Sequence, residues 1–199
     1  MSPDLSTLKL LAFDTSTETL SVAVAAPGRQ PLARSAPGGA QASATLLPAI
    51  LALLGEAGLA LAELDAIAFG CGPGSFTGLR TACSVAQGLA FGTEARRPQG
   101  VPVLPVDTLL AVAEEARHLA GGTQFVVALD ARMDEVYTAR WRHVQGAWLC
   151  DVDAALRAPE AVRLPPGWRL AGNAAAAYGA RLAAAPGIAA LPTATVTFK

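Results

Sequence analysis

A glycine-rich corner between an apolar strand and a helix constrains this chain more than any other feature. It lies within the segment Ile67-Ala-Phe-Gly-Cys-Gly-Pro-Gly-Ser-Phe-Thr-Gly-Leu-Arg80. The apolar run predicts a buried strand over Ala66–Gly70 that breaks at Gly72–Gly74. A helix then begins at Ser75 or Thr77, either of which can cap its free amides. Corners of this kind are where α/β proteins place phosphates or partners.

The glycines of the corner fit no standard nucleotide or catalytic fingerprint. A P-loop requires Lys and Ser or Thr after its last glycine, and here Leu79 and Arg80 follow. Ser75 stands where a dinucleotide fold has its third glycine. A nucleophile elbow has glycine two residues before its serine, and that position is Pro73. The corner therefore predicts none of these sites.

The corner resembles the hallmark of the TsaB (YeaZ) family, Gly-Pro-Gly-Ser-Phe-Thr-Gly-Leu-Arg, which stands intact at Gly72–Arg80. Five shorter segments match the family in the same order, and the resemblance extends from about residue 9 to residue 185. These segments are Leu11–Glu18, Leu46–Pro48, Leu129–Arg132, Glu135–Tyr137 and Leu170–Asn173.

The resemblance implies an α/β fold of the actin/Hsp70/sugar-kinase (ASKHA) type with two similar lobes. It also implies a non-catalytic subunit in the formation of threonylcarbamoyladenosine beside the tRNA anticodon. The related subunit TsaD carries the active site in that system, so we expect a TsaD-like partner, a TsaE-like ATPase reached through the complex, and a homodimer when the chain is alone.

Composition agrees with a chain that meets tRNA only through a partner. Of 199 residues, 52% are hydrophobic and 16% charged, and the net charge is −1. A protein that grips RNA unaided would show a basic stripe, which is missing here. Three scattered cysteines predict reduced core residues. Without a signal peptide or a membrane-length apolar run, we expect a cytoplasmic protein that does not enter a membrane.

Strands that alternate with helices predict a layered α/β architecture in two parts. We expect a leader over residues 1–8, an N-terminal lobe over 9–121 and a smaller C-terminal lobe over 122–199. A weak internal repeat supports duplication of one lobe. Leu11–Asp14 and Val127–Asp130 are both apolar strands that end in Asp, and a polar turn and an alternating strand follow each of them. The alternative is that Asp simply favours turns.

Two turns are candidates for at most weak or vestigial ATP or ADP binding. The first consists of Asp14, Thr15, Ser16 and Thr17, at the place where ATPases of this superfamily wrap phosphates. It lacks glycine, so an Asx turn that closes a hairpin is the favoured alternative. The second contains Asp130 and Arg132 and has little else to hold an anion. We predict no required cofactor.

Catalytic alternatives find little support. An actin-like ATPase or small-molecule kinase would need two complementary phosphate turns and a carboxylate for magnesium. A metallopeptidase would need clustered imidazoles, but the histidines are only His118 and His143. The same shortage excludes a Ser/His/Asp triad on Ser75. We therefore expect no metal site, no catalytic residue and no enzyme activity in the chain alone.

Two helices carry the predicted partner interface. Small residues recur every four positions in the second helix, which permits close approach of another helix. The first helix, over about Ser43–Ala57, is apolar nearly all round and needs cover on more than one side. The alternative is that both helices lie inside the monomer. The predicted interface residues are Leu46, Ala49, Leu53, Gly78, Ala82, Ala86 and Ala90.

The chain departs from the family in two places. Relatives carry His-Ser-Glu where this chain has Ala42-Ser43-Ala44, which makes the first helix more apolar. Relatives also continue beyond the helix that starts at Asn173 with another helix and a strand. We therefore expect the second lobe to be shortened at its C-terminus.

Overall fold

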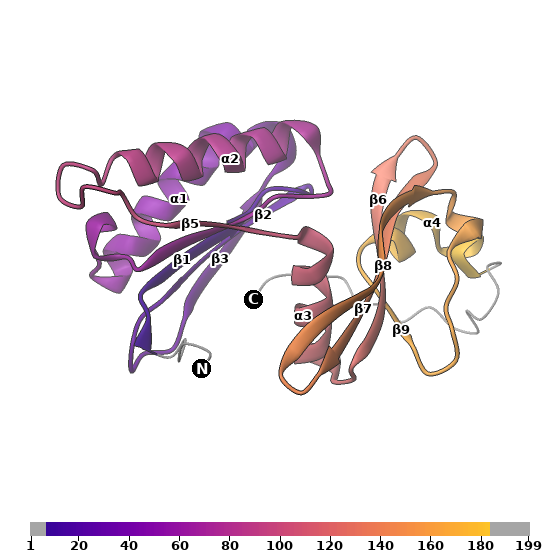
Figure 1. Cartoon of the computed structure of the whole chain (residues 1–199). Helices are drawn as coiled ribbons and strands as arrows, with labels where there is room; N and C mark the ends of the chain where they lie inside the picture. Colours follow the sequence, from indigo (N-terminus) through magenta and orange to yellow (C-terminus); the bar gives the residue numbers. More distant parts are fainter. Residues whose placement is uncertain (1–6, 184–199) are drawn as a thin grey trace. The chain divides into compact units, whose positions relative to one another are not determined.

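The computed structural model describes residues 7–183 as two compact units, one ending at Val106 and the other beginning at Asp107 (Figure 1). The division lies before the expected boundary at 121/122, because helix α3 (Thr108–Ala120) packs with the second unit. Its Leu109 and Val112 share a core with Phe125 and Val127. Most of the expected leader and the expected shortened end, residues 1–6 and 184–199, lie outside the described residues.

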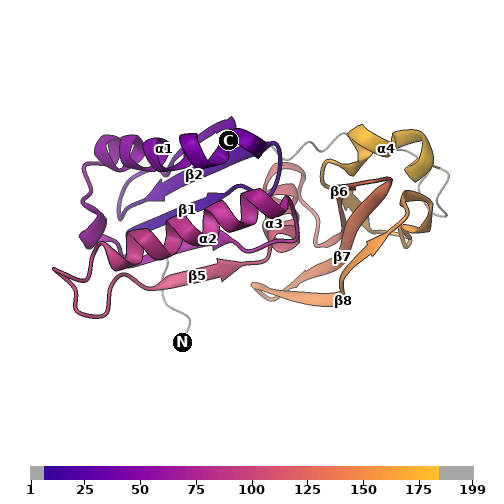
Figure 2. The ribbon, with the colours of Figure 1, turned by 90° about the horizontal axis from the view of Figure 1, so that it is seen from above.

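The first unit is a five-stranded sheet covered on one face by two helices (Figures 1 and 2). The sheet order is β3-β2-β1-β4-β5; the β1/β2 and β2/β3 pairs are antiparallel, whereas β4 runs parallel to β1 and β5. Its elements are β1 (Leu10–Asp14), β2 (Thr19–Ala25), β3 (Leu32–Pro37), α1 (Ala42–Ala57), β4 (Ala66–Gly70), α2 (Phe76–Phe91) and β5 (Val103–Val106).

The core of the first unit follows from the alternation along β2. Leu20, Val22 and Val24 point to one face and are almost fully buried with Leu46 and Ile50 of α1. By length and composition, Gly39–Ala57 would pass as a membrane span, a test that the core helix of a soluble protein also passes. In this unit that segment covers the sheet.

The second unit repeats the topology with four strands in the order β8-β7-β6-β9. The β6/β7 and β7/β8 pairs are antiparallel and the β6/β9 pair is parallel, as in β1/β2, β2/β3 and β1/β4. The predicted internal duplication is therefore confirmed at the level of topology. The elements after α3 are β6 (Gln124–Arg132), β7 (Glu135–Val144), β8 (Ala147–Arg157), a 3₁₀ turn (Pro159–Ala161), β9 (Arg169–Ala171) and α4 (Ala174–Ala183).

Alternation along β6 divides the core of the second unit between two faces. Phe125, Val127 and Leu129 pack towards α3, and Val126 and Ala128 pack on the opposite face, which also carries α4. A strand buried on both faces reads as a continuous apolar run, which is what the sequence shows here.

Candidate functional site

The glycine-rich corner packs directly on the turn after β1. A Cβ atom at Gly70 would lie 1.7 Å from an oxygen of the Asp14 carboxylate, and one at Gly78 would lie 1.8 Å from the carbonyl oxygen of Thr15. Real Cβ atoms do not approach other atoms so closely, so both positions require glycine. The sequence of the corner is thus explained by close approach within the first unit.

Hydrogen bonds join the corner to the turn on both sides. The amide of Ser75 donates to the carbonyl of Ser16 at 2.7 Å, and the Thr15 hydroxyl donates to the carbonyl of Gly78 at 2.7 Å. As predicted, Ser75 caps α2, its Oγ accepting from the amide of Gly78 at 3.4 Å. The corner and the turn therefore form one continuous packed structure.

The first predicted nucleotide turn is an Asx turn that is buried under this corner. The Asp14 carboxylate accepts hydrogen bonds from the Ser16 amide, at 2.7 Å, and from the Ser16 hydroxyl. Asp14, Thr15 and Ser16 are 9%, 0% and 4% exposed, and the Thr17 hydroxyl donates to the carbonyl of Thr19. The favoured Asx-turn interpretation is confirmed, and nucleotide binding stays a prediction.

The second predicted turn, in the other unit, also uses its carboxylate internally. Asp130 accepts hydrogen bonds from the Tyr178 hydroxyl and the Arg132 amide, both at 2.8 Å, and its own amide donates to Asn173. The hydrogen bond to Asp130 raises the pKa of Tyr178 because ionisation of the phenol would break it. The Arg132 guanidinium lies 3.7 Å from the Asp130 carboxylate. Asp130 and Arg132 thus lie together, as expected.

The predicted interface residues lie in or against the core of the first unit. Leu46, Leu53, Gly78, Ala82 and Ala86 are buried in the monomer. Ala49 and Ala90 are half-buried. The prediction that the small-residue stripe faces a partner is therefore wrong. The stripe has another physical role: it lets α2 lie close to its own sheet and to the turn at Thr15.

The opposite faces of the same helices expose large apolar side chains. Leu47 and Leu51 of α1 are 41% and 54% exposed, and Phe76 and Phe91 of α2 are 68% and 72% exposed. Arg80 lies over the Phe76 ring, 3.8 Å from its centroid. These five residues define the outer helical surface. Leu47 and Leu51 are four residues apart on α1, and Phe76 and Phe91 are fifteen residues apart on α2, so each pair lies on one face of its helix. A solvated helix carries polar residues on such a face. This spacing is visible in the sequence, although the predicted interface did not include these residues.

A hollow of about 410 Å³ lies within the outer helical surface, where the starts of α1 and α2 meet. Ser43 lines it from α1, and Phe76, Arg80 and Ser84 line it from α2. Exposed apolar patches with a polar rim are typical of protein–protein contact sites. This surface, rather than the buried stripe, is therefore the candidate functional site.

The histidines and cysteines form no cluster of metal ligands within residues 7–183. No three side chains of His, Cys, Asp or Glu come together there as metal ligands would. His118 is exposed near the end of α3, and the His143 ring meets the Trp148 ring edge-on at 5.1 Å. Cys71 and Cys150 are exposed and Cys83 is half-buried, so the expectation of three core cysteines is wrong.

Comparison with known proteins identifies the family. Residues 38–183 match the family model described as "TsaD: tRNA N6-adenosine threonylcarbamoyltransferase". The "tRNA threonylcarbamoyladenosine biosynthesis protein TsaB" of Haemophilus influenzae is 38% identical over 81% of this chain and 73% of its own length. The protein of the same name from Escherichia coli is 37% identical over 78% of this chain and 64% of its own length.

The solved structure of YeaZ from Pseudomonas aeruginosa superposes with a TM-score of 0.79 and 40% sequence identity, covering 94% of this chain and 83% of that one. The expected α/β fold with two similar lobes is confirmed by this match and by the repeated sheet topology, and its assignment to the actin/Hsp70/sugar-kinase type stays a prediction. By sequence and by fold, the chain belongs to the TsaB (YeaZ) family.

Proposed function

We propose that this chain is a subunit of the machinery that forms threonylcarbamoyladenosine on tRNA, and that it contributes a binding surface rather than an active site. The names of its relatives support the first part. The chain spans 73% and 64% of the lengths of those two relatives. Its part in the activity of the whole machinery is therefore a proposal.

The observation that carries the second part is the contrast between a filled corner and an exposed apolar surface. The turn at Asp14–Thr17 packs closely on Gly70, Gly74 and Gly78, where an added Cβ atom would lie 1.7–2.5 Å from atoms of the turn. A phosphoryl-transfer site needs open backbone amides and a carboxylate available to magnesium. Phe76 and Leu51 meanwhile remain exposed, as in a surface that is covered by another protein.

The partner in this proposal is a TsaD-type subunit that packs on the outer helical surface. Alone, the chain would pair with a second copy through the same surface, because both assemblies hide the same apolar area. A TsaE-type ATPase and the tRNA would be reached through the complex, since a net charge of −1 offers little phosphate attraction. The place of action would be the cytoplasm, and any ATP or ADP binding would be weak.

Reconstitution tests this proposal. Purified chain, the TsaD-type protein of the same cell and the remaining components are assayed for threonylcarbamoyl transfer to tRNA, with each protein omitted in turn. We expect no ATP turnover by this chain alone and loss of transfer when it is omitted. Turnover by the isolated chain at about 1 per second or faster, abolished by Asp14→Asn, would contradict the proposal. Full transfer without the chain would contradict it equally.

A further inference from the structure

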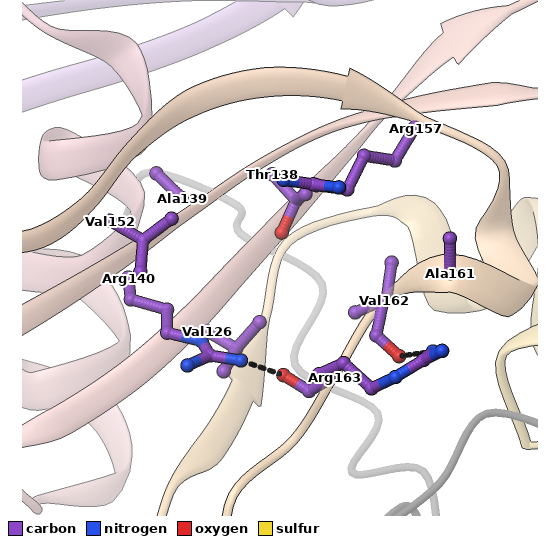
Figure 3. Close-up of a pocket in the computed structure, with 9 residues that line it drawn as sticks. All are labelled: Val126, Thr138, Ala139, Arg140, Val152, Arg157, Ala161, Val162 and Arg163. Carbon is purple, nitrogen blue, oxygen red and sulfur yellow. Dashed lines mark hydrogen bonds between the residues drawn. The ribbon is translucent and has the colours of Figure 1, made fainter.

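A hollow of about 280 Å³ opens on the sheet of the second unit, on the face that also carries α4. Val126, Thr138 and Arg140 line it from β6 and β7, Val152 and Arg157 from β8, and Arg163 from the connection to β9. Figure 3 shows the three arginines and Thr138 arranged around it. The hollow lies entirely within one compact unit.

The connection between the third and fourth strands differs between the two units, and the hollow lies where this connection is short. In the first unit, residues 38–65 join the third strand to the fourth and include the long helix α1, which covers β2 and β3. In the second unit the corresponding connection is residues 158–168, with a single 3₁₀ turn. So short a connection cannot cover β7 and β8 as α1 covers β2 and β3. Thr138 and three arginines, together with valines and alanines, line the part of this face that stays open.

Positive charge gathers in the hollow without a matching carboxylate. No acidic residue is among those that line it. Three carboxylates adjoin lining residues in the sequence, and each has a partner outside the lining. Asp151 accepts two hydrogen bonds from Arg142, at 2.9 and 3.0 Å, and also interacts electrostatically with Arg140. Asp153 accepts a hydrogen bond from the Cys150 thiol at 3.6 Å, and Glu160 is paired with Arg181. An anion that entered the hollow would therefore meet a lining that contains three arginines and no acidic residue.

The arginines of the hollow are held in place mainly by backbone carbonyls. Arg140 donates to the carbonyl of Arg163 at 3.2 Å and lies 6.0 Å from the ring centroid of Trp168. Arg163 donates to the carbonyls of Glu160 and Val162 at 3.0 and 3.2 Å. Within residues 7–183, the Arg157 guanidinium makes no hydrogen bond or ion pair. These contacts with neutral carbonyl groups fix two guanidiniums without pairing either of them with a carboxylate.

We propose that this hollow binds a phosphate-type oxyanion, with Arg157 and Arg140 as its main ligands and the Thr138 hydroxyl as a further donor. Guanidinium forks match the spacing of phosphate oxygens, and such charge-assisted hydrogen bonds are stronger than neutral ones. The phosphate can belong to a small molecule or to an RNA backbone, and both present the same oxygens. This site is independent of the outer helical surface and of the proposed function.

Binding to the full chain tests the site with two probes, inorganic pyrophosphate and a short single-stranded RNA, followed by calorimetry and by filter binding. We expect at least one probe to bind with a dissociation constant on the order of 1 mM or tighter. Arg157→Gln should weaken that probe about tenfold, which is what the loss of one charged hydrogen bond gives. Because Arg157 has no recorded internal bond, the variant should fold normally, as circular dichroism would verify. Arg140→Gln should weaken the same probe.

Arg34→Gln is the matched control, because it removes the same charge from an exposed strand residue of the first unit, where Arg34 is paired with Glu56. Its binding should equal that of the unchanged chain. Pyrophosphate binding alone identifies a small phosphate compound, and RNA that pyrophosphate displaces identifies backbone phosphates. The proposal is overturned if neither probe binds, if Arg157→Gln binds as the unchanged chain does, or if Arg34→Gln weakens binding as much as Arg157→Gln.

Discussion

The two units of this chain share a strand topology but differ in what covers their sheets. In the first, α1 and α2 cover one face so closely that the turn at Asp14 is sealed under glycines. In the second, the connection after β8 is short, and the corresponding face keeps a hollow lined by arginines. Duplicated topology thus leaves function free to differ, because function depends on the side chains and connections added to the strands.

The largest expected effect concerns the core under helix α2 of the first unit. Ala86 is fully buried in the core, so Ala86→Arg would place a long charged side chain where no space or partner exists. We expect destabilisation by more than about 4 kcal/mol and loss of folded protein. Urea unfolding followed by circular dichroism measures it. Gln87→Arg, at the exposed neighbouring position, is the control and should change stability by less than about 0.5 kcal/mol.

A smaller effect compares two glycines of the same helix. A Cβ atom at Gly78 would meet the Thr15 carbonyl at 1.8 Å, whereas nothing lies within 4 Å of one at Gly88. Gly78→Ala should destabilise the fold by about 1–3 kcal/mol through overpacking. Gly88→Ala should stabilise it by about 0.4–1 kcal/mol, because alanine favours the helix. Equal changes in the two unfolding midpoints would show that the corner is not packed as described.

The smallest effect lies in the second unit, at the turn that corresponds to the sealed one. The hydrogen bond to Asp130 raises the pKa of Tyr178, so its stabilising effect is present below the ordinary tyrosine pKa of about 10. It is lost as the pH rises through the folded-state pKa. Ultraviolet titration in a Tyr137→Phe background isolates Tyr178, since the chain has two tyrosines.

Replacing the acceptor tests the same turn. Asp130→Asn removes the negative charge that opposes ionisation of Tyr178, so the pKa of Tyr178 should fall towards its ordinary value. An unchanged titration curve would mean that Asp130 does not hold the phenol, and the account of the second turn would fail.

Local patterns predicted much of the fold. The Ser75 cap, the buried strand β4 and the matched hairpins all follow from short sequence signals, and the structure contains them. The strand β8 is harder to recognise, although it runs over Ala147–Arg157. Its side chains are mostly exposed and include Asp151 and Asp153, so apolar alternation along it is weak.

The sites were harder to predict, because they depend on partners distant in the sequence. A stripe such as Ala82 and Ala86 indicates close approach, but it does not say whether a sheet or a second molecule approaches. The outer helical surface could have been found from Phe76 and Phe91, which lie opposite that stripe. Nothing in the sequence around Arg140 and Arg157 predicts a shared hollow, since strand pairing and a short connection bring them together.

The outer helical surface is tested most directly by measuring association with the TsaD-type protein by sedimentation velocity. Leu51→Arg changes an exposed residue of this surface, and Leu119→Arg makes the same change at a helical residue of α3; the two leucines are 54% and 55% exposed. Both variants should remain folded. We predict that Leu51→Arg weakens association about tenfold or more, whereas Leu119→Arg leaves it unchanged. Undiminished association of Leu51→Arg, or equal losses in both variants, would contradict the account.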